Sequence, residues 1–251
     1  GVGLGVHGIV NARQGVLLFS PYFKWEDVPL KDKLEGVLNP QLLIDNDVRM
    51  MSYAEKWGGK EEFIFIYSGY GIGSAIVLNN QVYYGKDWSA GEFGHMTIVD
   101  NGPRCVCGSH GCLNSLISLP ELVKKYNVDF RNEVSFDRIQ KEWMEIIKNA
   151  RAGEEKAVTL LKDTGKYLGK GISNIINLIN PEAIIIGGYL VEIEDIIFPV
   201  IKEQIKEYAL KTSQKNIEIR TTKFGDLIGA IGAAVKVLEQ IFVINKEDTN
   251  S

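Results

Sequence analysis

The sequence predicts an α/β protein, and three of its features support this prediction. Short runs of β-branched and aromatic residues, such as residues 63–67 and 183–186, are typical of buried strands. Elsewhere, apolar residues recur every three or four positions over long segments, which is the spacing of amphipathic helices. The two patterns alternate throughout the second half of the chain, and such alternation characterises α/β folds.

The N-terminal part is expected to begin with a strand, because its first residues alternate glycine with apolar side chains. The predicted elements are strands at 1–8, 16–19 and 42–44, an aromatic loop at 21–29 and a helix at 48–57. The last of these strands ends at Asp45-Asn46-Asp47. Asp47 therefore lies where a strand passes into a helix, and a carboxylate caps a helix favourably there.

A β-meander is expected next, with strands at 63–67, 75–78 and 81–84. The pair Asn79-Asn80 predicts a hairpin turn between the last two strands. The first two are joined by the glycine-rich turn Ser68-Gly69-Tyr70-Gly71-Ile72-Gly73. Glycines let backbone N–H groups converge on a phosphate, but the same turn also suits a plain hairpin, so both interpretations stay open here.

The remaining elements alternate, with helices predicted at 119–126, 136–150, 154–178, 193–210 and 227–241 and strands at 183–186 and 217–220. The strand at 183–186 ends in Gly187-Gly188. Polar or glycine residues thus follow several strands, as expected if ligands bind at the carboxyl ends of the strands.

Composition limits the function classes. The 251 residues carry a net charge of −4 and a pI near 5.6, which argues against a chain that itself grips nucleic acid. No apolar run is long enough to cross a bilayer, and no signal peptide is evident, so a cytoplasmic protein with no membrane partner is expected. The sequence starts at Gly1 without methionine, inside a predicted strand, so a missing N-terminal portion is expected.

All three cysteines lie close together, in Cys105-Val-Cys107-Gly-Ser-His-Gly-Cys112. With His95 folding back from upstream, they supply three thiolates and one imidazole, the donor set of a structural zinc site. Ordinary buried thiols would not be expected to cluster in this way, and a disulfide would need an oxidising compartment. His110 is an alternative fourth ligand, but it has poor reach because it lies inside the same short loop.

The motifs resemble, in order and over nearly the whole chain, those of the ROK family of bacterial sugar kinases and sugar-responsive transcriptional repressors. They are Gly3-x-Gly5-Val-x-Gly8, Asp45-Asn46-Asp47, the turn 68–73, Ala90-Gly-Glu92-x-Gly-His95, the cysteine block and Asn180-Pro181-Glu-x-Ile-Ile-Ile-Gly-Gly188. The resemblance implies a two-domain, actin-like sugar-kinase (ribonuclease H-like) fold, with a sugar in the interdomain cleft and usually a dimer. We expect residues 1–45 to belong to an N-terminal subdomain and 46–251 to a larger one that holds the zinc loop 95–112. A return of the final helix to the first subdomain is an open alternative.

Site residues follow from the resemblance. Asn46, Asp47, Glu92, His95 and Asn114 correspond to sugar ligands, and His95 also to a ligand of the structural Zn²⁺. In a kinase, Asp47 would be the general base that accepts the proton of the attacking sugar hydroxyl. Taken alone, Asp47 would be interpreted as a helix cap; six motifs in the family's order favour the sugar site. The nucleotide positions are Gly69, Gly71, Gly73, Gly187 and Gly188, and they would matter only if the chain binds ATP and Mg²⁺.

Departures from the kinase pattern lie mainly on the nucleotide side. The family's kinases carry an Asp-x-Gly-Gly-Thr loop upstream of the first motif; nothing in this sequence matches it, and truncation alone would account for its absence. Their turn Thr-Gly-Thr-Gly-Ile-Gly-Gly-Gly becomes Ser68-Gly-Tyr70-Gly-Ile-Gly-Ser74-Ala75, and their three glycines become Gly187-Gly188-Tyr189. Tyr70 and Tyr189 are therefore expected to weaken a nucleotide site.

The residues that correspond to the sugar site depart less from the family pattern. The family's Gly-Cys-x-Glu becomes Gly111-Cys112-Leu-Asn114, which replaces a charged acceptor by an amide. His7 stands where proline usually precedes Gly8, and Tyr22 where asparagine often follows proline. The sequence is therefore interpreted as the sugar-binding effector part of a repressor, a homodimer or higher oligomer that reaches operator DNA through a domain upstream of Gly1. The alternatives are an ATP-dependent sugar kinase and a binding module without either activity.

Overall fold

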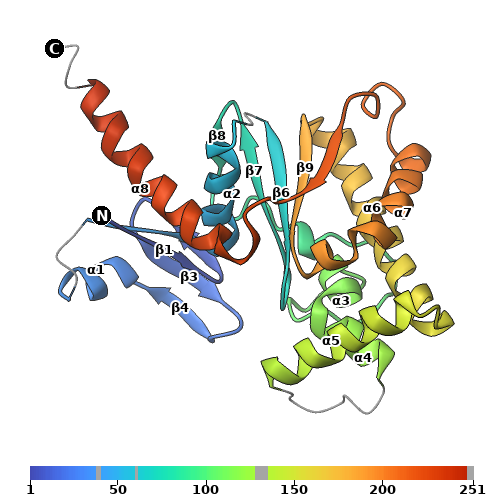
Figure 1. Ribbon diagram of the computed structural model, residues 1–251. Coiled ribbons are helices and arrows are strands. Elements are labelled where there is room, and N and C mark those ends of the chain that lie inside the picture. The colour runs from blue at the N-terminus through green and yellow to red at the C-terminus, as the bar shows by residue number, and fades with distance from the viewer. Residues whose placement is uncertain (38–40, 60–61, 128–134, 248–251) are drawn as a thin grey trace. The chain divides into compact units, whose positions relative to one another are not determined.

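The computed structural model describes residues 1–37, 41–59, 62–127 and 135–247. It contains both helices and strands, distributed over two compact units (Figure 1). The first unit comprises Gly1–Phe65, Ser74–Gly91 and Thr222–Ser251, and the second comprises Ile66–Gly73 and Glu92–Thr221. Residues on both sides of the boundary expected at residue 45 belong to the first unit. The helix that follows residue 45 packs on other elements of this unit. The final helix belongs to the first unit as well.

The first unit contains two small sheets. Strand β1 (Val2–Val6) pairs in parallel with β5 (Leu42–Asn46), and this register places Val6 opposite Asn46. The antiparallel strands β2 (Ile9–Asn11), β3 (Val16–Ser20) and β4 (Trp25–Val28) form the second sheet, and helix α1 (Leu30–Glu35) follows it. The loop expected at 21–29 is therefore wrong in its second half, where residues of β4 pair with β3. The apolar cluster under these strands includes Val10, Leu17, Leu42 and Ile44.

Two helices complete the first unit. Helix α2 (Asp47–Trp57) packs on α8 (Ile228–Glu247), and both pack on β1. A Cβ atom at Gly232 would lie 1.9 Å from the backbone oxygen of Met50, so the two helices approach closely only because this residue is glycine. The sequence predicted both helices.

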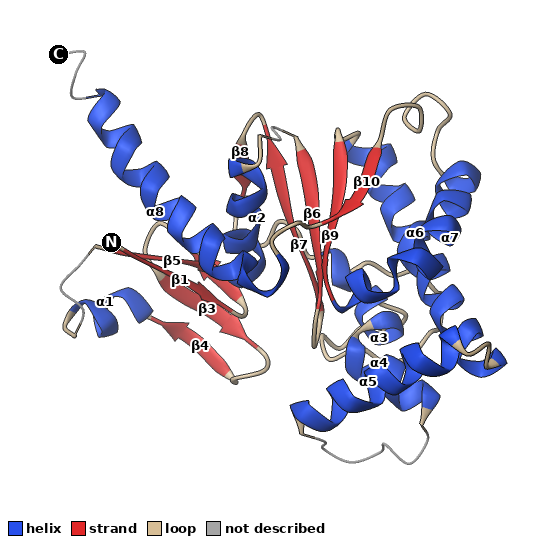
Figure 2. Cartoon of the chain, in the orientation of Figure 1, coloured by secondary structure: helices blue, strands red, loops and turns tan. Residues whose placement is uncertain are grey.

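The third sheet has the strand order β10-β9-β6-β7-β8 (Figure 2). Its strands are β6 (Phe63–Ser68), β7 (Ile72–Leu78), β8 (Gln81–Tyr83), β9 (Ala183–Gly188) and β10 (Glu218–Thr221). Strands β9 and β10 are parallel, whereas β7 and β8 form the expected hairpin. Asn79 and Asn80 both have positive φ, as a tight hairpin turn requires.

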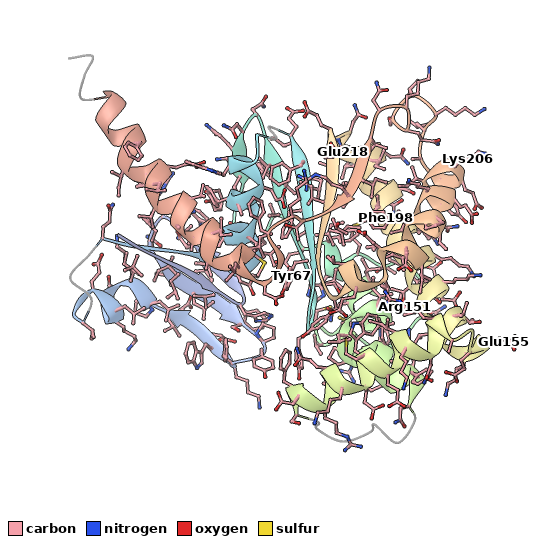
Figure 3. The ribbon with its side chains drawn as sticks, in the orientation of Figure 1. Tyr67, Arg151, Glu155, Phe198, Lys206 and Glu218 are labelled. Carbon is pink, nitrogen blue, oxygen red and sulfur yellow. The ribbon has the colours of Figure 1, made fainter. Side chains whose placement is uncertain are left out.

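The helices of the second unit are α3 (Leu113–Ile117), α4 (Leu119–Tyr126), α5 (Phe136–Arg151), α6 (Glu155–Ile179) and α7 (Glu194–Tyr208). Short 3₁₀ turns cover Phe93–His95 and Tyr189–Ile193, and a third in the first unit covers Gly225–Leu227. Helices α6 and α7 pack against each other. Phe198 and Lys206, which are labelled in Figure 3, lie on α7. Among the described residues, no helix combines the length and apolar composition needed to cross a membrane.

Candidate functional site

The turn between β5 and α2 presents Asn46 and Asp47. Asn46, and not Asp47, is the N-cap of α2: its Oδ1 accepts a hydrogen bond from the backbone N–H of Arg49 at 3.0 Å. Its Nδ2 donates to the Gly8 backbone oxygen at 3.1 Å and to Asp47 Oδ1 at 2.9 Å. Among the described residues, both hydrogen bonds to the Asp47 carboxylate are accepted by Oδ1, the other from the N–H of Val48. Asp47 is half-buried, so its Oδ2 is available to a ligand.

A buried ionic network lies directly beneath this turn and centres on Asp45, which is fully buried. Its Oδ1 accepts hydrogen bonds from the Asn46 backbone N–H at 2.8 Å and from Arg49 Nε at 2.7 Å. Its Oδ2 accepts from the Tyr84 hydroxyl at 3.0 Å and from Lys236 Nζ at 2.6 Å. Every lone-pair direction of the carboxylate is thus engaged, which is what makes a buried charge tolerable. The network fixes the backbone at Asn46 and ties it to α8.

The environment of the network shifts two pKa values in the same direction. Burial tends to lower the pKa of Lys236, but the nearby Asp45 carboxylate and the hydrogen bonds to it and to Tyr53 outweigh burial and raise this pKa above its ordinary value of 10.5. Burial, followed by the Asp45 charge, raises the pKa of Tyr84 well above its usual range. Both groups therefore stay protonated in the folded chain at pH values where they lose protons in the unfolded chain.

Stability is consequently expected to fall as the pH rises above about 10. A group whose pKa is higher in the folded than in the unfolded state stabilises the fold below its unfolded pKa, and this contribution is lost as the pH rises toward the folded pKa. Each of the two groups should remove up to about 1.4 kcal/mol of unfolding free energy per pH unit in this window. Urea unfolding between pH 8 and 11 measures the slope, and Tyr84→Phe should flatten it. An equally steep curve in that variant would contradict this account.

Glu92 and His95 lie together in the second unit. Glu92 precedes the 3₁₀ turn Phe93–His95, and its Oε2 is 3.9 Å from His95 Nε2. The turn is held by the buried Phe93 ring and by Gly94, where a Cβ atom would lie 2.1 Å from the Ile72 backbone oxygen. Both polar side chains stay accessible, Glu92 with half of its side-chain surface exposed. A carboxylate and an imidazole are therefore presented side by side on a fixed backbone.

The structure brings together His95, Cys105, Cys107 and Cys112, whose ligand atoms all lie within 4.8 Å of one another. His95 Nδ1 is 3.6 Å from Cys105 Sγ, and the sulfur atoms of Cys107 and Cys112 are 3.7 Å apart. A zinc tetrahedron with ordinary bond lengths has edges of about 3.8 Å between sulfurs and about 3.6 Å between sulfur and nitrogen. The two measured distances match these edges, so the four residues suit zinc as a ligand set. Because Nδ1 faces the sulfurs, Nε2 of the same ring faces Glu92.

The pKa values of two of the thiols are shifted in opposite directions. Burial and the neighbouring Cys107 and Cys105 raise the pKa of Cys112 to about 12. The pKa of Cys107 is lowered, chiefly by a backbone hydrogen bond at Ser109. A buried thiol with a raised pKa becomes a thiolate readily only when a metal ion compensates its charge.

His110 lies in the same loop but outside this cluster. Its backbone forms an isolated bridge with Arg104. The loop turns at Gly111, where φ is +68° and a Cβ atom would lie 1.8 Å from the Val99 backbone oxygen. The structure therefore favours His95 over His110 as the fourth donor.

Asn114 follows the cysteine block on α3 and supports a neighbouring turn. Its Oδ1 accepts a hydrogen bond from the backbone N–H of Ile72 at 2.9 Å, within the glycine turn 68–73. The amide therefore braces this turn, and a contact with sugar stays a prediction. This hydrogen bond was not predictable from local pattern, because it joins residues that are 42 positions apart.

The two glycine turns assigned to a nucleotide abut each other. A Cβ atom at Gly188 would lie 1.9 Å from the backbone oxygen of Ser68, and Gly188 has a φ of +78°. Tyr70, within the first turn, and Tyr189, after the second, both contact helix α5. The ring of Tyr70 stacks on Phe136 with centroids 5.5 Å apart, and Gln140 Nε2 donates to the Tyr189 hydroxyl at 3.0 Å.

A shallow groove of about 610 Å³ also lies in the second unit, between α7 and β10. Its lining includes Phe198, Pro199, Lys202 and Arg220, together with two acidic residues of α7, and Figure 3 labels Phe198 on this helix. The lining mixes both signs of charge and includes none of the predicted site residues.

The predicted residues thus form two groups. Asn46 and Asp47 belong to the first unit, whereas Glu92, the four metal-ligand candidates, Asn114 and the glycine turns belong to the second. Sequence reasoning missed the support of Asn46 by Arg49, Tyr84 and Lys236. A single lysine in the apolar segment 227–241 was the available signal, since a charge amid apolar helix residues calls for a buried partner.

This fold is the actin-like one shared by sugar kinases and related repressors, as comparison with solved structures shows. A crystal structure of a ROK family transcriptional regulator, a homolog of the E. coli MLC protein, superposes with a TM-score of 0.79 at 28% identity, over 91% of this chain and 60% of that one. A ROK family glucokinase from Streptomyces griseus, in complex with glucose and AMPPNP, superposes with a TM-score of 0.78 at 26% identity, over 92% and 79% of the two chains.

The chain belongs to the ROK family, whose sequence model matches residues 1–240. It is 30% identical to the xylose repressor of Bacillus spizizenii over 98% of its own length and 63% of the repressor. It is 29% identical to the glucokinase of Halalkalibacterium halodurans, over 96% of its own length and 76% of the kinase. The chain thus spans less than two thirds of the repressor and about three quarters of the glucokinase.

Proposed function

We propose that this chain is the sugar-binding effector part of a ROK transcriptional repressor and does not phosphorylate its ligand. The observation that carries the proposal is the state of the two glycine turns: Tyr70 lies within the first, Tyr189 follows the second, and both tyrosines contact α5. Operator DNA, a second copy of the chain and a DNA-binding domain upstream of Gly1 belong to the same proposal.

The nucleotide side supports the proposal through its side chains. A phosphate-binding turn works when small residues let backbone N–H groups approach the anion. Here the Tyr70 ring stands within the turn and stacks on Phe136, and the hydroxyl of Tyr189 is tied to Gln140. Displacing these rings would cost the stacking and hydrogen-bond energy before any phosphate contact is made. We therefore expect weak or no binding of ATP and Mg²⁺.

The sugar side, in contrast, retains well-positioned polar groups. Asn46 and Asp47 are fixed by the buried network beneath them, and Glu92 and His95 are fixed by the 3₁₀ turn. Amide, carboxylate and imidazole groups are suitable hydrogen-bond partners for sugar hydroxyls. If zinc occupies the four-residue cluster, it holds the His95 ring by Nδ1 and leaves Nε2 for a hydroxyl. Zinc would then be a structural ion that takes no part in chemistry.

Control of DNA binding would follow from linkage. Asn46 and Asp47 belong to one unit and Glu92 and His95 to the other. A sugar that has different affinities for two conformations of the chain favours the one that it binds more tightly. A domain attached upstream of the first unit would respond to that shift, and the sugar would alter DNA affinity by its differential affinity for the two conformations.

The rival proposal is an ATP-dependent sugar kinase, and the accessibility of Asp47 Oδ2 favours it. In that case Asp47 would accept the proton of the hydroxyl that attacks the transferred phosphoryl group. Proton transfer and sugar recognition need the same carboxylate, so the position of Asp47 is compatible with both proposals. Binding of ATP distinguishes the two proposals, because only the kinase requires it.

Asp47→Asn is expected to weaken sugar binding about 10- to 100-fold, since hydrogen bonds to a charged group contribute about 1.5–3 kcal/mol. Calorimetric titration with glucose, xylose and N-acetylglucosamine measures the affinities. Asp32→Asn is the matched control, because it removes an exposed carboxylate from the first turn of α1 in the same unit.

The same titrations with ATP and Mg²⁺ decide between repressor and kinase, with the H. halodurans glucokinase as the positive control. We expect no heat of ATP binding and no sugar phosphate. Phosphoryl transfer that disappears in Asp47→Asn would overturn the proposal in favour of a kinase. Equal sugar affinity of the parent and Asp47→Asn would exclude Asp47 from the site.

A further inference from the structure

An exposed row of aromatic rings lies on the first unit beside the turn that carries Asn46. Its members, named here the aromatic row, are His7, Tyr22, Phe23 and Trp25. The ring centroids of His7 and Tyr22 are 6.1 Å apart, those of Tyr22 and Phe23 5.3 Å, and those of Phe23 and Trp25 5.2 Å. Tyr22 is 69% exposed, and Phe23 and Trp25 are close to half exposed. Contiguous exposed aromatic surface of this kind marks binding sites on soluble proteins.

The backbone connects the aromatic row directly to the predicted sugar ligands. His7 precedes Gly8, whose backbone oxygen accepts the hydrogen bond from Asn46 Nδ2 at 3.1 Å. The register of the parallel pair β1 and β5 likewise places Val6, the residue before His7, opposite Asn46. The aromatic row therefore starts at His7, between the register partner of Asn46 and the residue that accepts its hydrogen bond.

The row is also held rigidly. Gly8 has a φ of +126°, and a Cβ atom there would lie 2.4 Å from the Phe19 backbone oxygen, so the His7-Gly8 segment is pressed against β3. His7 Nδ1 lies 3.4 Å from the hydroxyl of the fully buried Ser20. Lys24, between Phe23 and Trp25, adopts the left-handed conformation with a φ of +54°. Strained turns of this kind occur where a surface is shaped for a ligand.

We propose that the aromatic row is a second subsite, which stacks on the second ring of a disaccharide-sized ligand whose first ring is bound at Asn46 and Asp47. The C–H faces of a pyranose ring are apolar and stack on aromatic rings, whereas its hydroxyls need the polar groups next to them. The inference rests on the proposed sugar-binding function and adds the size of the ligand. The departures at His7 and Tyr22 from the usual family residues are then changes of specificity.

Titration with matched pairs of sugars tests this inference: glucose against maltose and cellobiose, and xylose against xylobiose. We expect at least one disaccharide to bind about five- to tenfold more tightly than its monosaccharide, the gain of one aromatic stacking contact. Phe23→Ala should bring this ratio close to one. Tyr83→Ala, which removes an exposed tyrosine of β8 in the same unit, should leave the ratio unchanged. Tryptophan fluorescence gives a second measurement, because the emission change on disaccharide binding should disappear in Trp25→Phe.

The outcomes separate the inference from the function on which it rests. Monosaccharide binding that depends on Asp47, with no gain for any disaccharide or with a gain that Phe23→Ala leaves intact, overturns the second subsite alone. Absence of binding for every sugar overturns both proposals. A change in oligomeric state of Phe23→Ala by light scattering, with an unchanged disaccharide ratio, would identify the row as a contact between two copies and would also overturn the subsite.

Discussion

Replacing Lys236 by methionine is expected to lower the free energy of unfolding by about 1.5–3 kcal/mol, because the buried Asp45 carboxylate loses one of its two cationic partners and keeps only Arg49. Lys236 Nζ lies 2.6 Å from Asp45 Oδ2 and also donates to the hydroxyls of Tyr53 and Tyr84. Methionine fills a similar volume without a charge, so packing is nearly retained and the electrostatic loss dominates. Urea unfolding followed by circular dichroism measures the difference.

A double variant separates the ion pair from the lysine itself. Removing both partners in Asp45→Asn with Lys236→Met should cost less than the sum of the single changes, since each single change already removes the same ion pair. Lys166→Met is the matched control, because this exposed lysine pairs with the exposed Asp163 on the surface, and no measurable loss is expected. Additive costs in the double variant would show that Lys236 stabilises the chain by packing alone.

The same network has a consequence for ligand binding. Asp45 Oδ1 holds the backbone N–H of Asn46, and Asn46 caps α2. A displaced Asp45 would therefore move the donor and acceptor groups that a sugar needs. Lys236, which comes from α8 and is far away in the sequence, acts as a positioning residue for Asn46.

Much of this fold was predictable from local pattern. The helices α4, α5 and α6 and the strands β6 and β9 follow from hydrophobic spacing and β-branched runs, since both report burial within a few neighbouring residues. Strand β4 was missed because its residues Trp25–Val28 are mostly exposed and it has only one strand neighbour. Helix α3 was missed because its five residues are too few to show a period.

The candidate site also has parts that local sequence predicts and parts that depend on long-range packing. The cysteine cluster was predictable because its residues are close in sequence and their chemistry is specific. The capping role assigned to Asp47 moved by one residue, since the Asn46 amide bonds to the backbone N–H of Arg49. The contacts of Tyr70 with Phe136 and of Asn114 with Ile72 depend on how distant segments pack, and no local pattern reports that.

Loss of one cysteine of the metal cluster is expected to remove bound zinc and to destabilise the loop that holds it. Cys112→Ser is expected to lower the zinc content from about one ion per chain to nearly none, because a serine hydroxyl does not replace a thiolate as a zinc ligand. Structural zinc contributes about 10–16 kcal/mol in small zinc-binding peptides, so a fold that relies on it loses much of its local stability without the ion. Elemental analysis and thermal unfolding, with and without a chelator, measure the two effects in parallel.

His110→Ala is the matched control for this experiment, since it removes a potential ligand from the same loop but outside the cluster. Full zinc content and an unchanged melting temperature are expected for this variant. If zinc is retained in Cys112→Ser and lost in His110→Ala, the ligand assignment is wrong. Zinc loss in Cys112→Ser should also weaken sugar binding, because His95 would no longer be held by Nδ1 while Nε2 faces Glu92. Unchanged sugar affinity in the metal-free chain would instead limit the metal to stabilising the loop, with recognition left to Asn46 and Asp47.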